Sequence, residues 1–239
     1  MLSLLVALSG AILGLTAHDL AIQGLTAHRP LRPLVGVCPR CGHRRGWLRL
    51  RCPECGRPVR RELLFASVSA LTALGFVGTI GLRWPLIAYG GFLLLSGALL
   101  ITDLEQLRIV DRINLRGTAM VAVLLAVTAV AVGDLPALAR GLAGAAIYFA
   151  GAFLLWTIVR GRGFGGGDVK LAPQIGLFTA YVSWGTLGWA AFATAMIGGV
   201  LAIALLITGR AHAKTELPYG PPMILGAWLA IALVGAGLP

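Results

Sequence analysis

The sequence predicts an all-α fold: a polytopic membrane helical bundle with about eight transmembrane helices and one small cytoplasmic loop. Of its 239 residues, 58% are hydrophobic and only 12% are charged, whereas soluble domains carry about 25% charged residues. The apolar residues form blocks of about 16 to 22 residues, long enough to cross a hydrocarbon core of about 30 Å. These observations exclude an ordinary soluble globular domain.

Eight apolar blocks are predicted as spans. In chain order they are Leu2–Ala17, Leu63–Leu82, Pro85–Thr102, Gly117–Val132, Ala137–Val159, Leu171–Ser183, Gly188–Ile207 and Gly220–Gly237. The first is short and is followed by His18 and Asp19, so an interfacial helix is the alternative there. The sixth is also short, and Trp184 and Trp189 near its end are typical of an aromatic belt at the membrane surface.

The positive charge predicts the topology. The segment Gly24–Glu62 holds ten of the 20 Lys and Arg residues. If this loop is cytoplasmic, only Arg83 and Arg140 fall on the opposite side, in accord with the positive-inside rule. Both termini are then expected outside, and the net charge of +11 requires no nucleic-acid partner. No basic residue precedes the first apolar run, unlike a secretory signal peptide, so we expect this run to stay in the mature protein.

Four cysteines predict a metal site in this basic loop. They form the motifs Cys38-Pro-Arg-Cys41-Gly and Cys52-Pro-Glu-Cys55-Gly. Two such turns supply the tetrahedral thiolate shell of a structural zinc ion and leave no open coordination position. Two disulfides are the alternative, which a reducing cytoplasm disfavours. His43 is a less favoured alternative ligand.

The most informative of the nine acidic residues lie where apolar spans meet predicted cytoplasmic loops. Asp103 ends the third span, and Asp168 precedes the sixth, directly after the run Gly163-Phe-Gly-Gly-Gly167. Carboxylates near the membrane interior are costly and indicate function. The glycines allow a helix start or a substrate backbone to approach Asp168 closely. Capping of the following helix is the alternative role of Asp168.

A pair of neighbouring carboxylates would support acid and base catalysis. Two such groups cannot easily both ionise, so one of them keeps a proton. The ionised member can deprotonate water while the protonated member polarises a scissile carbonyl, as in aspartyl proteolysis. We therefore expect Asp103 and Asp168 to face each other at the cytoplasmic membrane surface. No serine, histidine or free cysteine arrangement in the sequence competes as a nucleophile.

Three stretches resemble motifs of the type IV prepilin peptidases, membrane aspartyl peptidases with a Gly-x-Gly-Asp motif. Residues 163–171 resemble the family's Gly-Met-Gly-x-Gly-Asp-x-Lys-Leu, and residues 103–111 resemble its Asp-x-Asp-x-x-x-x-Pro-Asp. Pro218-Tyr-Gly-Pro221 is similar to its Pro-Phe-Gly-Pro turn. The paired cysteines followed by Glu62 match as well, so the resemblance covers nearly the whole chain.

The resemblance implies that the chain removes the short basic leader of type IV prepilins or pseudopilins, the components of type IV pili and type II secretion systems. It implies a multi-pass protein of the bacterial inner membrane whose active site faces the cytoplasm and whose catalytic residues are Asp103 and Asp168. The supporting or substrate-binding residues that we expect are Glu105, Asp111, Gly163, Gly165, Gly167 and Lys170.

Many members of that family also methylate the new N-terminus with S-adenosylmethionine. Here Glu105 and Val110 replace the usual Asp and Pro. Only ten residues separate the two cysteine pairs, whereas methylating relatives have a longer spacing, and the first span lacks their Asn-containing signature. We therefore predict proteolysis without methylation, with S-adenosylmethionine a cofactor only if methylation is retained.

A non-enzymatic membrane protein, such as an ion transporter or an assembly factor with a zinc-binding loop, is the alternative function. Transporter sites usually lie near the membrane midplane, whereas both aspartates are predicted at one surface. The expected organisation is a first transmembrane helix at 1–23, a basic cytoplasmic loop with the zinc knuckle at 24–62, and a peptidase core at 63–239. The expected partners are the prepilin substrate and the lipid bilayer.

Overall fold

The computed structural model describes residues 2–25, 36–38, 41, 44–45, 52, 54–56, 60–106, 109–159, 164–208 and 219–235. Within these residues the chain forms eight helices and one antiparallel pair of strands. The helices are α1 (Leu2–Leu25), α2 (Arg60–Ile80), α3 (Pro85–Gln106), α4 (Asp111–Ala131), α5 (Leu135–Ile158), α6 (Gly166–Val182), α7 (Trp184–Ile207) and α8 (Gly220–Gly235). The strands are β1 (Gly36–Val37) and β2 (Arg44–Arg45). The predicted all-helical fold class is confirmed.

Six of these helices, α1 to α5 and α7, are long and apolar enough to cross a membrane. The helices α6 and α8 have 17 and 16 residues and reach only about 26 and 24 Å at 1.5 Å per residue. Most side chains of both are buried in the bundle. The eight predicted spans therefore correspond to six full-length spans and two short, enclosed helices of a multi-pass membrane protein.

The first helix is longer than predicted. It was expected to end at Ala17, but α1 continues to Leu25. His18 and Asp19, which suggested an exit from the membrane, are each only 3% exposed. A polar side chain enclosed by protein does not have to reach water, so the helix continues past these residues. The division of the chain into segments 1–23, 24–62 and 63–239 remains a prediction.

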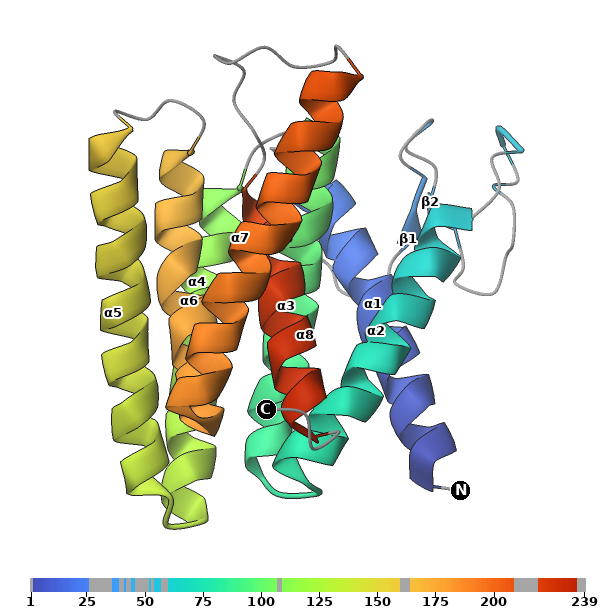
Figure 1. The fold of residues 1–239 in the computed structure, drawn as a ribbon. Coiled ribbons are helices and arrows are strands. Elements are labelled where there is room, and N and C mark those ends of the chain that lie inside the picture. The colour runs from blue at the N-terminus through green and yellow to red at the C-terminus, as the bar shows by residue number, and fades with distance from the viewer. Residues whose placement is uncertain are drawn as a thin grey trace.

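Successive helices alternate in direction (Figure 1). The strands, the end of α3 and the starts of α4, α6 and α8 lie toward one end of the bundle, whereas the start of α1 and the end of α8 lie toward the other (Figure 1). The regions that carry the cysteines and the two aspartates therefore share one end. Which side of the membrane this end faces remains a prediction.

The two helices that carry the aspartates are fixed to each other by aromatic packing. The rings of Phe92 on α3 and Phe178 on α6 stack with their centroids 4.5 Å apart. The buried hydroxyl of Tyr89 on α3 donates a hydrogen bond of 2.7 Å to the carbonyl of Phe178. A buried hydroxyl without such a partner would be costly. These contacts set the register between α3 and α6.

The other side of α6 packs very closely on α5. A Cβ added at Gly144 would lie 2.2 Å from the Cβ of Ala180, and one added at Gly176 would lie 2.3 Å from the carbonyl oxygen of Gly144. Only glycine fits at such a contact, and small residues that let backbones approach are typical of membrane helix pairs. This contact explains part of the high glycine content.

The far end of α6 is held by Arg140 of α5. Its guanidinium donates hydrogen bonds of 2.7, 2.6 and 3.0 Å to the carbonyl oxygens of Ala180, Tyr181 and Val182. The last carbonyls of a helix have no partner within the helix and carry partial negative charge. Asp168 lies at the start of α6, and Arg140 provides the hydrogen-bond donors for the carbonyls at its other end.

Candidate active site

Asp103 and Asp168 meet at one point of the bundle. Asp103 lies in the last turn of α3 and Asp168 in the first turn of α6, and they are only 4% and 5% exposed. A Cβ placed at Gly220, the first residue of α8, would lie 2.7 Å from Asp103 Oδ2 and 3.4 Å from Asp168 Oδ1. Because both oxygens are that close to a single point, they lie within about 6 Å of each other, the range in which two carboxylates interact strongly.

Asp168 also stabilises the start of its own helix. Its Oδ2 accepts a hydrogen bond of 3.0 Å from the backbone N–H of Gly165, and its own N–H donates to the Gly165 carbonyl at 3.1 Å. Gly220 at the start of α8 lies against the same carboxylate, since a Cβ placed there would be 3.4 Å from Asp168 Oδ1. The starts of α6 and α8 thus both direct their positive dipole ends at the acid pair. The capping role considered for Asp168 is present, together with its position beside Asp103.

The glycines before Asp168 differ in what surrounds them. A Cβ at Gly167 would lie 3.1 Å from the Cβ of Ile109, and a Cβ at Gly165 would lie 3.3 Å from Asp168 Oδ2. Among the described residues, nothing would lie within 4 Å of a Cβ at Gly166. Of the residues predicted as supporting, Gly167 therefore lies in confined space, whereas Gly165 is exposed and adjoins the Asp168 carboxylate. Gly163 lies outside the described residues.

The three charged residues that were expected to support the site form ion pairs around it. Glu105 at the end of α3 accepts from Arg61 of α2 at 2.9 Å, and Asp111 at the start of α4 accepts from Lys170 of α6 at 2.7 Å. All four side chains are at least 37% exposed. Lys170 thus orients a carboxylate, but it is that of Asp111. The substrate-binding role of these residues stays a prediction.

Three further residues border the site and were not predicted as site residues. They are Phe164, Tyr219 and Gly220. The rings of Phe164 and Tyr219 meet edge to face with their centroids 5.3 Å apart. Each precedes a glycine whose backbone contacts Asp168. The signal in the sequence was the Pro218-Tyr-Gly-Pro221 motif, which indicated a turn but not its contact with the acids.

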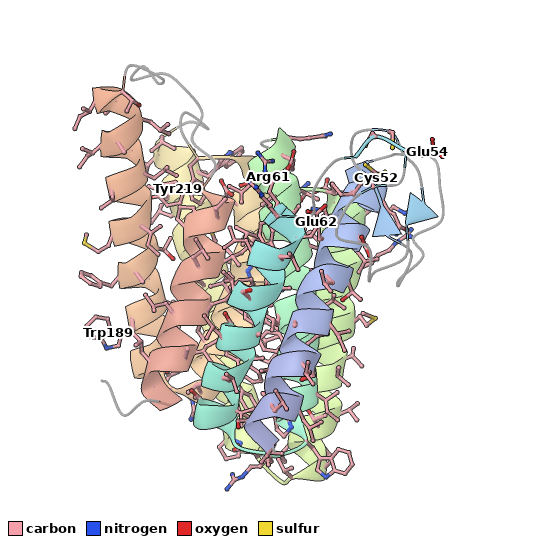
Figure 2. The ribbon with its side chains drawn as sticks, turned by 90° about the vertical axis from the view of Figure 1, so that its right-hand side faces the viewer. Cys52, Glu54, Arg61, Glu62, Trp189 and Tyr219 are labelled. Carbon is pink, nitrogen blue, oxygen red and sulfur yellow. The ribbon has the colours of Figure 1, made fainter. Side chains whose placement is uncertain are left out.

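The four cysteines form a separate cluster at the same end of the bundle, and Figure 2 shows Cys52 there with Arg61 and Tyr219. All four Sγ atoms lie within 4.8 Å of one another, with Cys38 and Cys55 at 3.5 Å and Cys41 and Cys52 at 3.6 Å.

These sulfur distances fit one metal ion. Zinc bonded to four thiolates at about 2.3 Å holds its sulfurs about 3.8 Å apart, whereas a disulfide would bring two of them to about 2 Å. The backbone N–H of Cys55 lowers the pKa of the Cys52 thiol, which favours the thiolate that binds metal. The cluster can therefore hold a metal such as zinc, and the expected alternative ligand His43 lies outside the described residues.

Known proteins whose sequences are similar to this chain carry the same name. The prepilin leader peptidase/N-methyltransferase of Pseudomonas aeruginosa is 26% identical over 212 residues, 82% of this chain and 70% of that protein. The protein of the same name from Aeromonas salmonicida is 25% identical over 219 residues (81% and 69%), and that from Bacillus subtilis is 29% identical over 195 residues (82% and 70%). A model of the type IV leader peptidase family matches residues 89–207, which include both aspartates. The chain belongs to this family.

Membership of the type IV leader peptidase family agrees with the resemblance noted in the sequence and makes the chain a peptidase. It therefore disfavours the alternative of a non-enzymatic transporter or assembly factor. No solved structure matches the chain significantly. The geometry of the site described above thus comes from this structure alone.

Because Gly220 contacts both aspartates, we predict that adding a side chain at this position reduces activity. The change Gly220→Ala places a methyl group 2.7 Å from Asp103 Oδ2 and so displaces at least one carboxylate. Because misplacing a reacting group by about 1 Å can cost about 100-fold in rate, we expect a loss of that order in leader peptidase activity. The matched control is Gly166→Ala, whose methyl group meets nothing within 4 Å. Equal rates for the two variants would contradict the described geometry.

Proposed function

We propose that this chain is an aspartyl endopeptidase that cleaves the short basic leader from type IV prepilins or pseudopilins, with Asp103 and Asp168 as its acid and base. The observation that carries the proposal is the meeting of two buried carboxylates, from α3 and α6, against the backbone of Gly220. Family membership supports the reaction class, and the names of its relatives support the substrate class.

The pair supplies both proton transfers that peptide hydrolysis needs. The ionised carboxylate removes a proton from water, whose oxygen attacks the scissile carbonyl carbon, while the protonated carboxyl donates its proton to the carbonyl oxygen. Collapse of the tetrahedral intermediate breaks the carbon–nitrogen bond, and a carboxyl returns a proton to the leaving amine. The products are the leader with a free carboxylate and the mature chain with a new amino terminus.

The exposed acids beside the pair are suited to receive a basic leader. Glu105 and Asp111 are paired with Arg61 and Lys170 in pairs that are open to solvent. Exposed pairs contribute only about 0 to 1 kcal/mol, so the positive residues of a leader can replace these partners at little cost. In this proposal the end of the bundle that carries the site faces the cytoplasm, where the positive charge of the chain also concentrates.

The acid pair predicts the outcome of isosteric changes. Asp103→Asn and Asp168→Asn each remove a titrating group while keeping the side-chain shape, so each is expected to slow leader cleavage by about 1,000-fold or more. The double variant should be no worse than either single one, because the two groups act as a unit. Glu105→Gln should have a milder effect. The measurement is the cleavage rate of a purified prepilin in detergent, followed by mass spectrometry.

Membrane insertion and metal content serve as the controls for these variants, since neither should change. Either aspartate-to-asparagine variant cleaving the prepilin at near the wild-type rate would require the pair to be abandoned.

We further propose that the cysteine cluster holds one structural zinc ion through Cys38, Cys41, Cys52 and Cys55. The sulfur spacing supports it, and four thiolates would leave no position for a reacting water. Elemental analysis of the purified protein should give one zinc per chain. A thiol reagent should label the cysteines only after a chelator has removed the metal. Labelling that does not depend on the chelator, or a protein without metal, would contradict this assignment.

We also propose that the chain cleaves without methylating its product, although its relatives carry both activities in their names. The proposal is supported by the ten residues between the two cysteine pairs. When a prepilin is cleaved in the presence of S-adenosylmethionine, the mature product should have the mass of the unmodified peptide. A product heavier by one methyl group would show that methylation is retained.

A further inference from the structure

An apolar cavity of about 490 Å³ lies between α5 and α7, next to the acid pair. We call it the α5–α7 groove. It extends along α5 from Ile147 to Leu155 and along α7 from Trp184 to Ala195. The eight-residue step between Ile147 and Leu155 corresponds to about 12 Å, or roughly two helical turns. Cavities of this volume are typical of binding sites.

The groove exists because its two walls pack on different partners. α5 packs closely on α6 through Gly144 and Gly176, and α7 packs on α8, where a Cβ at Gly226 would lie 2.8 Å from Thr194 Oγ1. The helices α5 and α7 themselves touch little. Between them, the hydroxyls of Tyr148 and Thr194 share a hydrogen bond of 3.2 Å. The walls are thus held apart by packing on each side.

Among the larger side chains that line the groove, small residues leave part of each wall open. A Cβ at Gly151 of α5 or at Gly188 of α7 would meet nothing within 4 Å, and Ala191 and Ala195 continue the same wall. In the membrane, small residues let another helix approach closely. A row of them on α7, opposite Gly151 and Ala152 of α5, is better suited to a helix than to a flexible acyl chain, which gains little from a flat backbone surface.

One end of the groove leads to the acid pair. Phe164 and Tyr219 line the groove, and each is followed by a glycine whose backbone contacts the carboxylate of Asp168. Asp103 completes the pair. It is 4% exposed, and its Oδ2 has no hydrogen-bond partner among the described residues. The acids do not line the cavity themselves, but Phe164 and Tyr219 do. An occupant whose chain continues past these two residues would bring a polar group to the unpartnered acid.

We propose that the α5–α7 groove binds the first two turns of the apolar helix that follows the scissile bond of the substrate. The helix lies against Gly151 and Gly188, and the peptide bond before it extends past Phe164 and Tyr219 to the acid pair. This inference rests on the proposed leader cleavage and adds where the membrane part of the substrate binds.

The first test fills the groove. Gly151→Leu places a side chain in the groove where a Cβ has no steric conflict, and Gly199→Leu is the matched control on α7, because Gly199 also has nothing within 4 Å and does not line the groove. With a membrane-anchored prepilin in lipid vesicles, Gly151→Leu should slow cleavage by about tenfold or more, and Gly199→Leu should not slow it. Unchanged thermal unfolding of both variants shows that the fold is intact.

The second test detects the substrate directly and does not depend on turnover. Gly151→Cys or Gly199→Cys is combined with Asp168→Asn, and the prepilin carries a single cysteine within two turns after the scissile bond. Oxidation should link the prepilin to position 151 and not to position 199. The four cysteines of the cluster are present in both variants, so any cross-linking to them is the same in both and does not affect the comparison.

The outcomes separate the two proposals. If wild-type protein cleaves the prepilin but Gly151→Leu cleaves it equally well and position 151 forms no cross-link, then the groove holds a lipid chain or nothing, and this inference is wrong while leader cleavage stands. If the wild-type protein does not cleave the prepilin at all, the proposed function fails. Cross-linking at 151 in the absence of cleavage would still support binding in the groove.

Discussion

Two carboxylates enclosed in a membrane bundle impose the strictest demand on this structure, because charge is expensive away from water. The bundle meets that demand at Asp168 with a backbone group, whereas Asp103 Oδ2 has no hydrogen-bond partner among the described residues. The backbone N–H of Gly165 at the start of α6 donates to Asp168, and the absence of a side chain at Gly220 lets α8 begin against both acids. The aromatic contacts between α3 and α6 and the glycine contact between α5 and α6 keep these helix ends in place.

The order and number of the helices were predictable from the sequence because each apolar block is bounded by polar residues. Their ends were less predictable. His18 and Asp19 looked like a membrane boundary, but they are buried beside other helices, and no pattern within α1 itself reveals that. The shortness of α6 and α8 was likewise not predictable, because it depends on the longer helices that enclose them. A helix enclosed by protein does not have to match the bilayer thickness.

The two aspartates were predictable as site candidates because each lies at the end of an apolar block, one of them after a glycine run. The role of Gly220 was not predictable. It lies 52 residues after Asp168 in the sequence. Only the tertiary structure shows that a Cβ at Gly220 would lie against the carboxylate oxygens of both aspartates. The same limit applies to the pairing of Lys170 with Asp111, since the sequence shows the charges but not which of them become neighbours.

The helix α6 is attached to its neighbour α5 at its far end, where the guanidinium of Arg140 donates hydrogen bonds to the carbonyls of Ala180 and Tyr181. A shift of α6 along its axis would break these hydrogen bonds, whereas the hydrogen bond from Gly165 to Asp168 would move with the helix. The depth of Asp168 in the membrane is therefore set partly from the opposite leaflet, by an arginine on a neighbouring helix. Stretching or thinning of the bilayer that moves Arg140 would act on the position of a carboxylate near the other surface.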